Sequence, residues 1–134
     1  MSLTEEERIA IVDLKLSKAE RAYKDMCANY DLHMYCTAAN RLYYCLFYAC
    51  SALLVCDGHE AHTHSGNITL IGLNYVKPGI ISSEFGKLLR AAFKLRQESD
   101  YDDYYDVKKE DIESYVEPAR DFILLVKQLI ASKR

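Results

Sequence analysis

The chain has 134 residues, 50% of them hydrophobic and 28% charged, with a formal net charge of −3 and a pI near 5.8. This length and composition predict a single globular domain over residues 1–134, with one packed core. The negative balance excludes a protein that coats nucleic acid with its whole surface, so any contact with phosphate must come from a local basic patch.

The first half of the chain predicts two long helices. Thr4-Glu5-Glu6-Glu7 is typical of a capping box, and apolar residues then recur at alternating steps of three and four: Ile9, Val12, Leu16, Ala19, Tyr23, Met26 and Tyr30. This helix ends near Asn29-Tyr30-Asp31. A second helix, from about 32 to 56 and antiparallel to the first, carries the apolar run that follows Arg41, and Asp57-Gly58 ends it with glycine at C′.

The second half predicts shorter elements. Residues 58–67 are polar and turn-like, and Ile68 to Val76 form a short helix before Pro78-Gly79. Ser82 or Ser83 caps a helix that runs to about Ser99, with these residues facing inward: Phe85, Leu88, Leu89, Ala92 and Leu95. Residues 100–106 are acidic and form a loop.

A last helix runs from Ile112 to about 132 and is kinked at Pro118. No segment shows strand-like alternation of useful length. We therefore expect an all-α fold, an antiparallel up-and-down bundle of four to five helices.

Other sequence features bear on compartment and cofactors. The five cysteines contain no Cys-x-x-Cys pair, and three lie in the apolar run, which predicts free thiols in a reducing cytoplasm. No export signal is evident, and the run of fifteen residues is shorter than the roughly twenty that a membrane span needs, so no membrane association is expected. The histidines at 59, 62 and 64 match no zinc signature; no metal and no cofactor are predicted.

Arg41 is the first candidate binding residue, because it lies at the start of a helix that is apolar on every side. Tyr44 and Tyr48 share its helix face. One interpretation pairs Arg41 with an acidic side chain and leaves the tyrosines in the core. The other is a phosphate or RNA-backbone site, because guanidinium binds phosphate in bidentate fashion and tyrosine can donate a hydrogen bond or stack on a base.

The second candidate group is Arg96 with Asp100 and Tyr101. An ion pair between Arg96 and Asp100 is one interpretation, and such a pair at a surface contributes about 0 to 1 kcal/mol. The tyrosines that alternate with aspartates over 100–106 offer another, a partner surface or a modifiable tyrosine. We expect Arg41 and Arg96 to converge on one pocket for an anion.

Three segments resemble one known family. Asn40-Arg41-Leu42-Tyr43-Tyr44-Cys45-Leu46-Phe47-Tyr48-Ala49 resembles the "Ser-Arg-Ala-Tyr-Tyr-Ala-Met-Phe-His-Ala" helix of HEPN-domain proteins in the branch UPF0332. Thr63-His64-Ser65-Gly66-Asn67-Ile68 is similar to the "Thr-His-Ser-Gly" turn of that branch. Leu95-Arg96-Gln97-Glu98-Ser99-Asp100-Tyr101 is similar to its "Leu-Arg, three residues, Asp-Tyr" helix end. The matches occur in the family's order and cover nearly the whole chain.

The resemblance implies a helical bundle that commonly forms a homodimer, with a polar groove near the arginine helices. Many HEPN proteins are toxin halves of prokaryotic toxin–antitoxin pairs, encoded beside a minimal nucleotidyltransferase. Several are metal-independent endoribonucleases with an Arg, four to six residues, His motif. Arg41 takes the arginine position, but the histidine position falls on Tyr48, and a phenol with a pKa of about 10 is a poor general base.

The resemblance also implies that Arg96, Asp100 and Tyr101 are the remaining polar residues of the groove. A tyrosine of this region can be adenylylated in relatives, and the candidates are Tyr101, Tyr104 and Tyr105.

These observations lead to one hypothesis and two alternatives. The hypothesis is a component of a prokaryotic toxin–antitoxin system that binds RNA phosphate or a nucleotide, or docks a minimal nucleotidyltransferase, with these binding residues: Arg41, Tyr44, Arg96, Asp100 and Tyr101. The first alternative is an active metal-independent endoribonuclease in which Arg41 and Tyr48 are catalytic. The second is a structural dimerising bundle whose arginines only form ion pairs.

Overall fold

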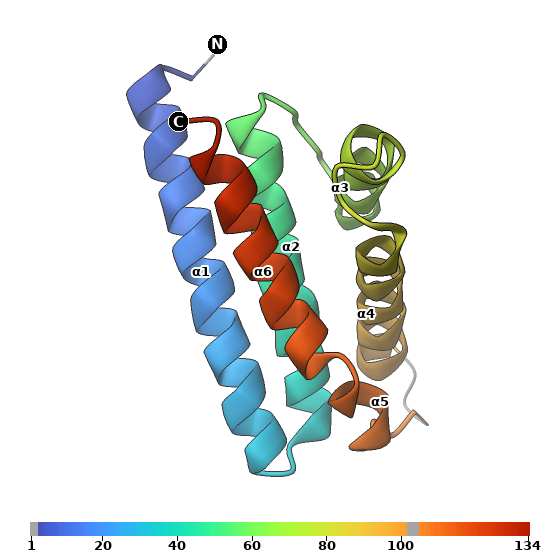
Figure 1. The fold of residues 1–134 in the computed structure, drawn as a ribbon. Helices are drawn as coiled ribbons and strands as arrows, with labels where there is room; N and C mark the ends of the chain where they lie inside the picture. Colours follow the sequence, from blue (N-terminus) through green and yellow to red (C-terminus); the bar gives the residue numbers. More distant parts are fainter. Residues whose placement is uncertain (1–2, 102–104) are drawn as a thin grey trace.

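The computed structural model describes residues 3–101 and 105–134, and every regular element in those ranges is helical (Figure 1). The elements, in chain order, are α1 (Glu5–Asp31), α2 (Tyr35–Cys56), α3 (His64–Ile71), the π-helical turn η1 (Gly72–Val76), α4 (Ser83–Tyr101), α5 (Glu110–Glu113) and α6 (Val116–Ala131). The long helices α1, α2, α4 and α6 alternate in direction, and the two termini lie at the same end. The predicted all-α antiparallel bundle is confirmed.

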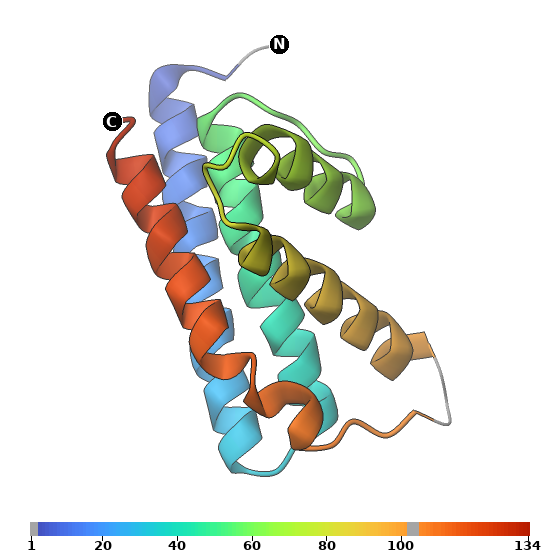
Figure 2. The same cartoon turned by 45° about the vertical axis from the view of Figure 1, so that its right-hand side comes forward.

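Helix α2 is the centre of the fold. It packs against α1, α6, α4 and α3, with α1 and α6 on one side and α3 and α4 on the other (Figure 2). Small buried residues let these backbones approach closely: Ala38, Ala39, Ala49, Cys50 and Ala52. By length and composition α2 could also cross a membrane, but 61% of its most apolar window is buried inside the bundle. Neighbouring helices therefore cover most of its apolar surface.

Local sequence signals account for most helix ends. The predicted capping box is present, because Thr4 Oγ1 accepts from the Glu7 N–H at 3.1 Å and Glu7 Oε1 accepts from the Thr4 N–H at 3.0 Å. At the end of α2, Gly58 takes the predicted C′ position with φ of 78°, and its N–H donates to the Val55 carbonyl at 3.1 Å. Only glycine adopts this conformation without steric cost.

Three expectations about helix boundaries were wrong. First, the helix predicted to begin at Ile68 begins at His64, inside the segment expected to be a loop, because Thr63 caps it. Second, α4 continues through Asp100 and Tyr101, which were expected to lie in the acidic loop. Third, Pro118 does not kink a helix; α5 ends at Glu113, and Pro118 lies in the first turn of α6, where its missing N–H has no helical partner to lose.

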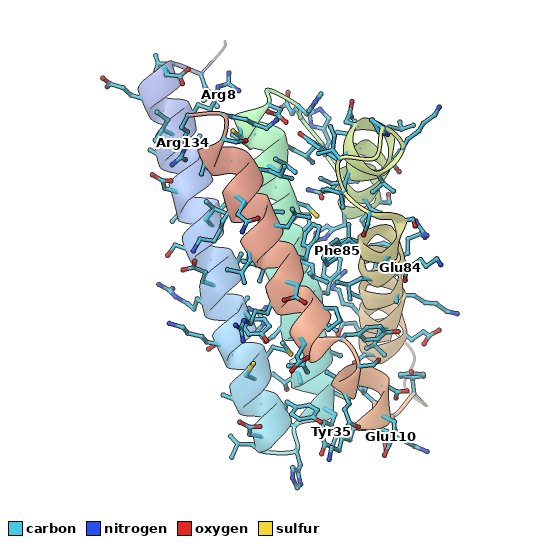
Figure 3. All side chains as sticks on the ribbon, in the orientation of Figure 1. Arg8, Tyr35, Glu84, Phe85, Glu110 and Arg134 are labelled. Atoms are coloured by element: carbon cyan, nitrogen blue, oxygen red, sulfur yellow. The ribbon has the colours of Figure 1, made fainter. Side chains whose placement is uncertain are left out.

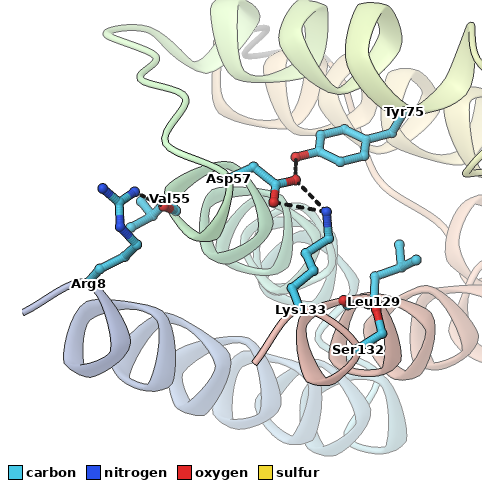
Figure 4. Close-up of polar contacts among 7 residues, drawn as sticks. All are labelled: Arg8, Val55, Asp57, Tyr75, Leu129, Ser132 and Lys133. Atoms are coloured by element: carbon cyan, nitrogen blue, oxygen red, sulfur yellow. Dashed lines mark hydrogen bonds and ion pairs between the residues drawn. The ribbon is translucent and has the colours of Figure 1, made fainter. Parts of the chain in front are cut away.

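The end of the bundle that carries the termini is closed by polar contacts to α2. The Asp57 carboxylate accepts from the hydroxyl of the buried Tyr75 and from Lys133 Nζ, with both carboxylate oxygens 2.9 Å from that nitrogen (Figure 4). Arg8 Nη1 donates to the Val55 carbonyl at 2.8 Å. Figure 3 shows Arg8 and Arg134 at this end and Tyr35 and Glu110 at the opposite end. The residues that follow α6 are thereby tied to the end of α2.

The two contacts of Asp57 are expected to differ in strength. Asp57→Ala should lower the free energy of unfolding by about 1 to 3 kcal/mol, because it leaves the Tyr75 hydroxyl without an acceptor. Lys133→Met should lower it by no more than about 1 kcal/mol, because the lysine side chain is 37% exposed. Urea unfolding of both variants checks this, and equal losses would contradict it.

Two glycines offer a matched test of backbone conformation. Gly58→Ala should destabilise the protein by about 1 kcal/mol, because alanine is strained at positive φ. Gly72→Ala should stabilise it by about 0.4 to 1 kcal/mol, because Gly72 is helical and a Cβ there would meet no atom within 4 Å. Thermal unfolding monitored by circular dichroism measures both, and the same sign for the two variants would contradict the account.

Candidate phosphate-binding site

The structure brings Arg41 of α2 and Arg96 of α4 to the same aromatic ring. The Cζ atom of Arg41 lies 5.1 Å from the centroid of the Tyr44 ring, and that of Arg96 lies 5.3 Å from it. Arg96 also lies 5.2 Å from the centroid of the Tyr43 ring. The contact is made within one protomer. We call Arg41, Tyr43, Tyr44, Arg96 and, as described below, His64 the arginine–tyrosine cluster.

The cluster lies on the one stripe of α2 that keeps contact with solvent. Between residues 38 and 54 of α2, only five positions are partly exposed, and they recur at helical spacing: Asn40, Arg41, Tyr44, Phe47 and Tyr48. The remaining positions of this stretch are buried against neighbouring helices. The predicted shared face of Arg41, Tyr44 and Tyr48 is therefore the accessible face of α2.

The charges in the cluster do not balance. Asp100 Oδ2 lies 3.3 Å from Arg96 Nε, which is the ion pair expected from the sequence. That nitrogen is buried and forms no hydrogen bond among the described residues. The ion pair between Arg96 and Asp100 therefore lacks hydrogen-bond geometry at Nε. Arg41 donates from Nε and Nη2 to the neutral Asn40 Oδ1, at 3.0 and 2.8 Å. Over residues 3–101 and 105–134, no carboxylate forms an ion pair with Arg41.

Tyr48 extends the stripe toward α1. Its ring lies 5.8 Å from that of Tyr44, and Lys18 Nζ of α1 lies 5.7 Å from the Tyr48 centroid. Three cationic side chains thus lie against two neighbouring tyrosine rings, in a protein whose net charge is negative. This is a local positive patch of the kind that the composition requires for any phosphate contact.

His64 joins the cluster from α3, although the sequence offered it only as a loop residue. Its Nδ1 lies 2.6 Å from the Tyr43 hydroxyl oxygen, and its ring stacks on Phe47 with centroids 4.4 Å apart and planes at 16°. Burial and the neighbouring Arg96 charge lower the pKa of His64, which favours the neutral imidazole. Burial also raises the pKa of Tyr43, and its hydroxyl stays protonated.

The segment Thr63–Asn67 fixes the position of His64. Thr63 Oγ1 accepts from the Gly66 N–H at 2.9 Å and caps α3 just before His64. A Cβ on Gly66 would lie 2.9 Å from that same oxygen, so the cap requires glycine here. The buried Asn67 donates from Nδ2 to Ser51 Oγ at 3.0 Å and ties α3 to α2. A threonine three residues before glycine, followed by apolar residues, was the sequence signal for this cap.

The other candidate residues lie apart from the cluster or outside the described part of the chain. His62 is exposed and His59 faces Tyr75, with ring centroids 6.4 Å apart; across the described residues no group of three His, Cys, Asp or Glu side chains could hold a metal. Burial, with the Asp111 and Glu98 carboxylates, raises the pKa of the partly buried Tyr105. Tyr104 and the side chain of Tyr101 lie outside the described residues.

Comparison with known proteins places this chain in a family. The model of the HEPN domain matches residues 12–129. A UPF0332 protein of Archaeoglobus fulgidus is 31% identical over 123 residues, which are 92% of this chain and 98% of the relative. A UPF0332 protein of Thermotoga maritima is 33% identical over 94 residues, 70% of this chain and 71% of the relative.

A third relative, from Methanocaldococcus jannaschii, is named "Putative toxin MJ0142" and is 28% identical over 118 residues, 88% of this chain and 80% of the relative. The all-helical fold and these matches agree. The chain belongs to the HEPN domain family, in its UPF0332-like branch.

Proposed function

We propose that this chain is a toxin-like HEPN protein that binds single-stranded RNA, with Arg41 and Arg96 as ligands of one backbone phosphate. The observation that carries the proposal is the convergence of two guanidinium groups on the Tyr44 ring, with one carboxylate, that of Asp100, paired to them among the described residues.

The electrostatics of the cluster favour an added anion. Two like charges held against one ring repel each other, and the effective dielectric near a protein surface makes this repulsion larger than in bulk water. The cation–π contacts with Tyr44 offset it by roughly 0.5 to 1 kcal/mol each at partly exposed sites. A phosphate between the two guanidinium groups would remove the repulsion and form charge-assisted hydrogen bonds with both. Tyr44 then serves mainly to hold the arginines in place.

RNA suits this stripe better than an isolated phosphate does. Lys18 lies beyond Tyr48 on the same face, where it can contact a second phosphate of an extended strand. The exposed edges of Tyr48 and Phe47 offer surfaces on which unpaired bases can stack. Asp100 balances part of the Arg96 charge and thereby limits nonspecific binding of anions.

The wider biological role rests on the comparisons. The family match and the relative whose printed name calls it a toxin support a toxin-like role. As part of the proposal, the chain is a cytoplasmic homodimer that pairs with a minimal nucleotidyltransferase, whose modification target is Tyr101, Tyr104 or Tyr105.

Salt-dependent RNA binding tests the phosphate site. Arg41→Gln should weaken binding of a short fluorescent single-stranded RNA roughly tenfold to a hundredfold, because it removes a charge-assisted bond of about 1.5 to 3 kcal/mol. The slope of log K against log salt concentration should also become shallower by about 0.7, the value for one phosphate contact on a single strand. Fluorescence anisotropy over a salt series measures both quantities.

Arg90→Gln is the matched control, because Arg90 is an exposed arginine of α4 outside the cluster. It should leave affinity and slope unchanged. If Arg41→Gln alters only the thermal stability and leaves RNA binding intact, the arginines are structural and the proposal is wrong. ATP titrated in the same assay should compete weakly, because it offers the site no extended backbone.

A further inference from the structure

The position of His64 bears on chemistry as well as on binding. In the family's motif the histidine shares a helix with the arginine, but residue 48 of this chain is tyrosine. His64, from α3, stacks on Phe47, the residue next to Tyr48, and lies 5.9 Å from the Tyr44 ring that carries both arginines. The arginine–tyrosine cluster therefore contains an imidazole, although this imidazole comes from a different helix than the one in the family's motif.

We propose that His64 is the general base of a metal-independent RNA cleavage at this cluster, with Tyr43 as the residue that positions it. This inference rests on the proposed RNA-phosphate site.

The contact with Tyr43 leaves one of the two imidazole nitrogens open to RNA. Nδ1 is engaged by the Tyr43 hydroxyl at 2.6 Å, and Tyr43 is only 2% exposed, so this contact excludes RNA from that nitrogen. The proposed base is the tautomer in which Nδ1 carries the proton and donates it to Tyr43 Oη, which leaves the free lone pair on Nε2. Stacking on Phe47 fixes the plane of the ring. The base is thus held in one orientation by two residues of α2.

The reaction needs no co-reactant beyond RNA. Nε2 of His64 takes the proton of a ribose 2′-hydroxyl, and the 2′-oxygen forms a bond to the adjacent phosphorus. The bond from phosphorus to the 5′-oxygen breaks, and that oxygen takes a proton from solvent, while the imidazolium returns its proton to solvent. Arg41 and Arg96 stabilise the charge on the phosphorane oxygens. The products are a 2′,3′-cyclic phosphate and a 5′-hydroxyl.

Tyr48 is less suited to this step. A phenol with a pKa of about 10 is almost fully protonated at pH 7, whereas a neutral imidazole accepts a proton readily. The ring of Tyr48 lies against Lys18 and Tyr44, on the α1 side of the stripe. Its place in the site is consistent with contact to the RNA strand.

Cleavage of a labelled single-stranded RNA by the purified full chain in EDTA tests the inference. His64→Gln should reduce the rate about 100-fold or more, the usual contribution of a general base, and leave the RNA Kd unchanged. His62→Gln, a change at an exposed histidine two residues away, should leave the rate unchanged. A single 2′-deoxy substitution at the cleaved position should block the reaction, and the product should carry a cyclic phosphate.

The dependence of the cleavage rate on pH is a second test, because it would not change if His64 had only a structural role. Among the described residues, the titratable groups that face His64 are Arg96 of α4 and Tyr43 and Tyr44 of α2; burial and then Arg96 lower the pKa of the imidazole. Because the base must be unprotonated, kcat/KM should rise with pH through a midpoint below about 6.5 and then level off. Tyr43→Phe should lower kcat with little change in KM and move this midpoint.

Each result decides between the two proposals. Wild-type protein that binds RNA but leaves it whole in EDTA overturns the inference and leaves the proposed binding function in place. Full cleavage by His64→Gln, or loss of cleavage in Tyr48→Phe alone, also overturns it. Wild-type protein that binds no RNA contradicts the proposed function itself. Circular dichroism shows whether each variant is folded, and His64→Asn replaces His64→Gln if the latter is not.

Discussion

The enclosure of α2 by four other helices is the constraint on which the rest of the structure depends. Because its neighbours cover most of its surface, the side chains of α2 between residues 38 and 54 that meet solvent are confined to one stripe. Arg41 and Tyr44 lie on this stripe, and α3 and α4 flank it. His64 of α3 and Arg96 of α4 therefore come close to the same tyrosine side chains of α2. The site is thus built on the open stripe of a central helix.

The charge distribution suits the proposed ligand. With a net charge of −3, the protein as a whole does not attract an anionic strand, whereas the cations along the stripe do. Such a contrast orients an approaching polyanion and raises the rate of productive encounter. The two arginines also differ in their partners. Arg96 is partly neutralised by Asp100, whereas Arg41 is held by the neutral Asn40 and has no carboxylate partner in residues 3–101 and 105–134.

The parts of the fold that follow from local patterns were predictable. The seam of α1, the glycine at the end of α2 and the inward face of α4 all follow from spacing and capping, and Arg41 and Tyr44 share a face by the same periodicity. His64 was missed for two reasons. The polar composition of residues 58–67 suggested a loop and hid the threonine cap of α3. The partner of His64, Tyr43, lies 21 residues earlier in the chain and next to Tyr44, which is the residue that shares the helix face of Arg41. The spacing of residues within one helix cannot predict a contact between residues of two different helices. Pro118 was misread because its effect depends on whether it lies within a helix or in its first turn.

The close contact between Thr63 and Gly66 limits how this segment can change. A side chain at 66 collides with the hydroxyl at 63, and a residue at 63 without that hydroxyl leaves the start of α3 uncapped. Tolerated variation at either position therefore depends on the other, and the two should evolve as a coupled pair. In a relative without this pair of residues, the imidazole of residue 64 would be displaced. Such a protein would keep the two arginines but lose the neighbouring group that can accept a proton.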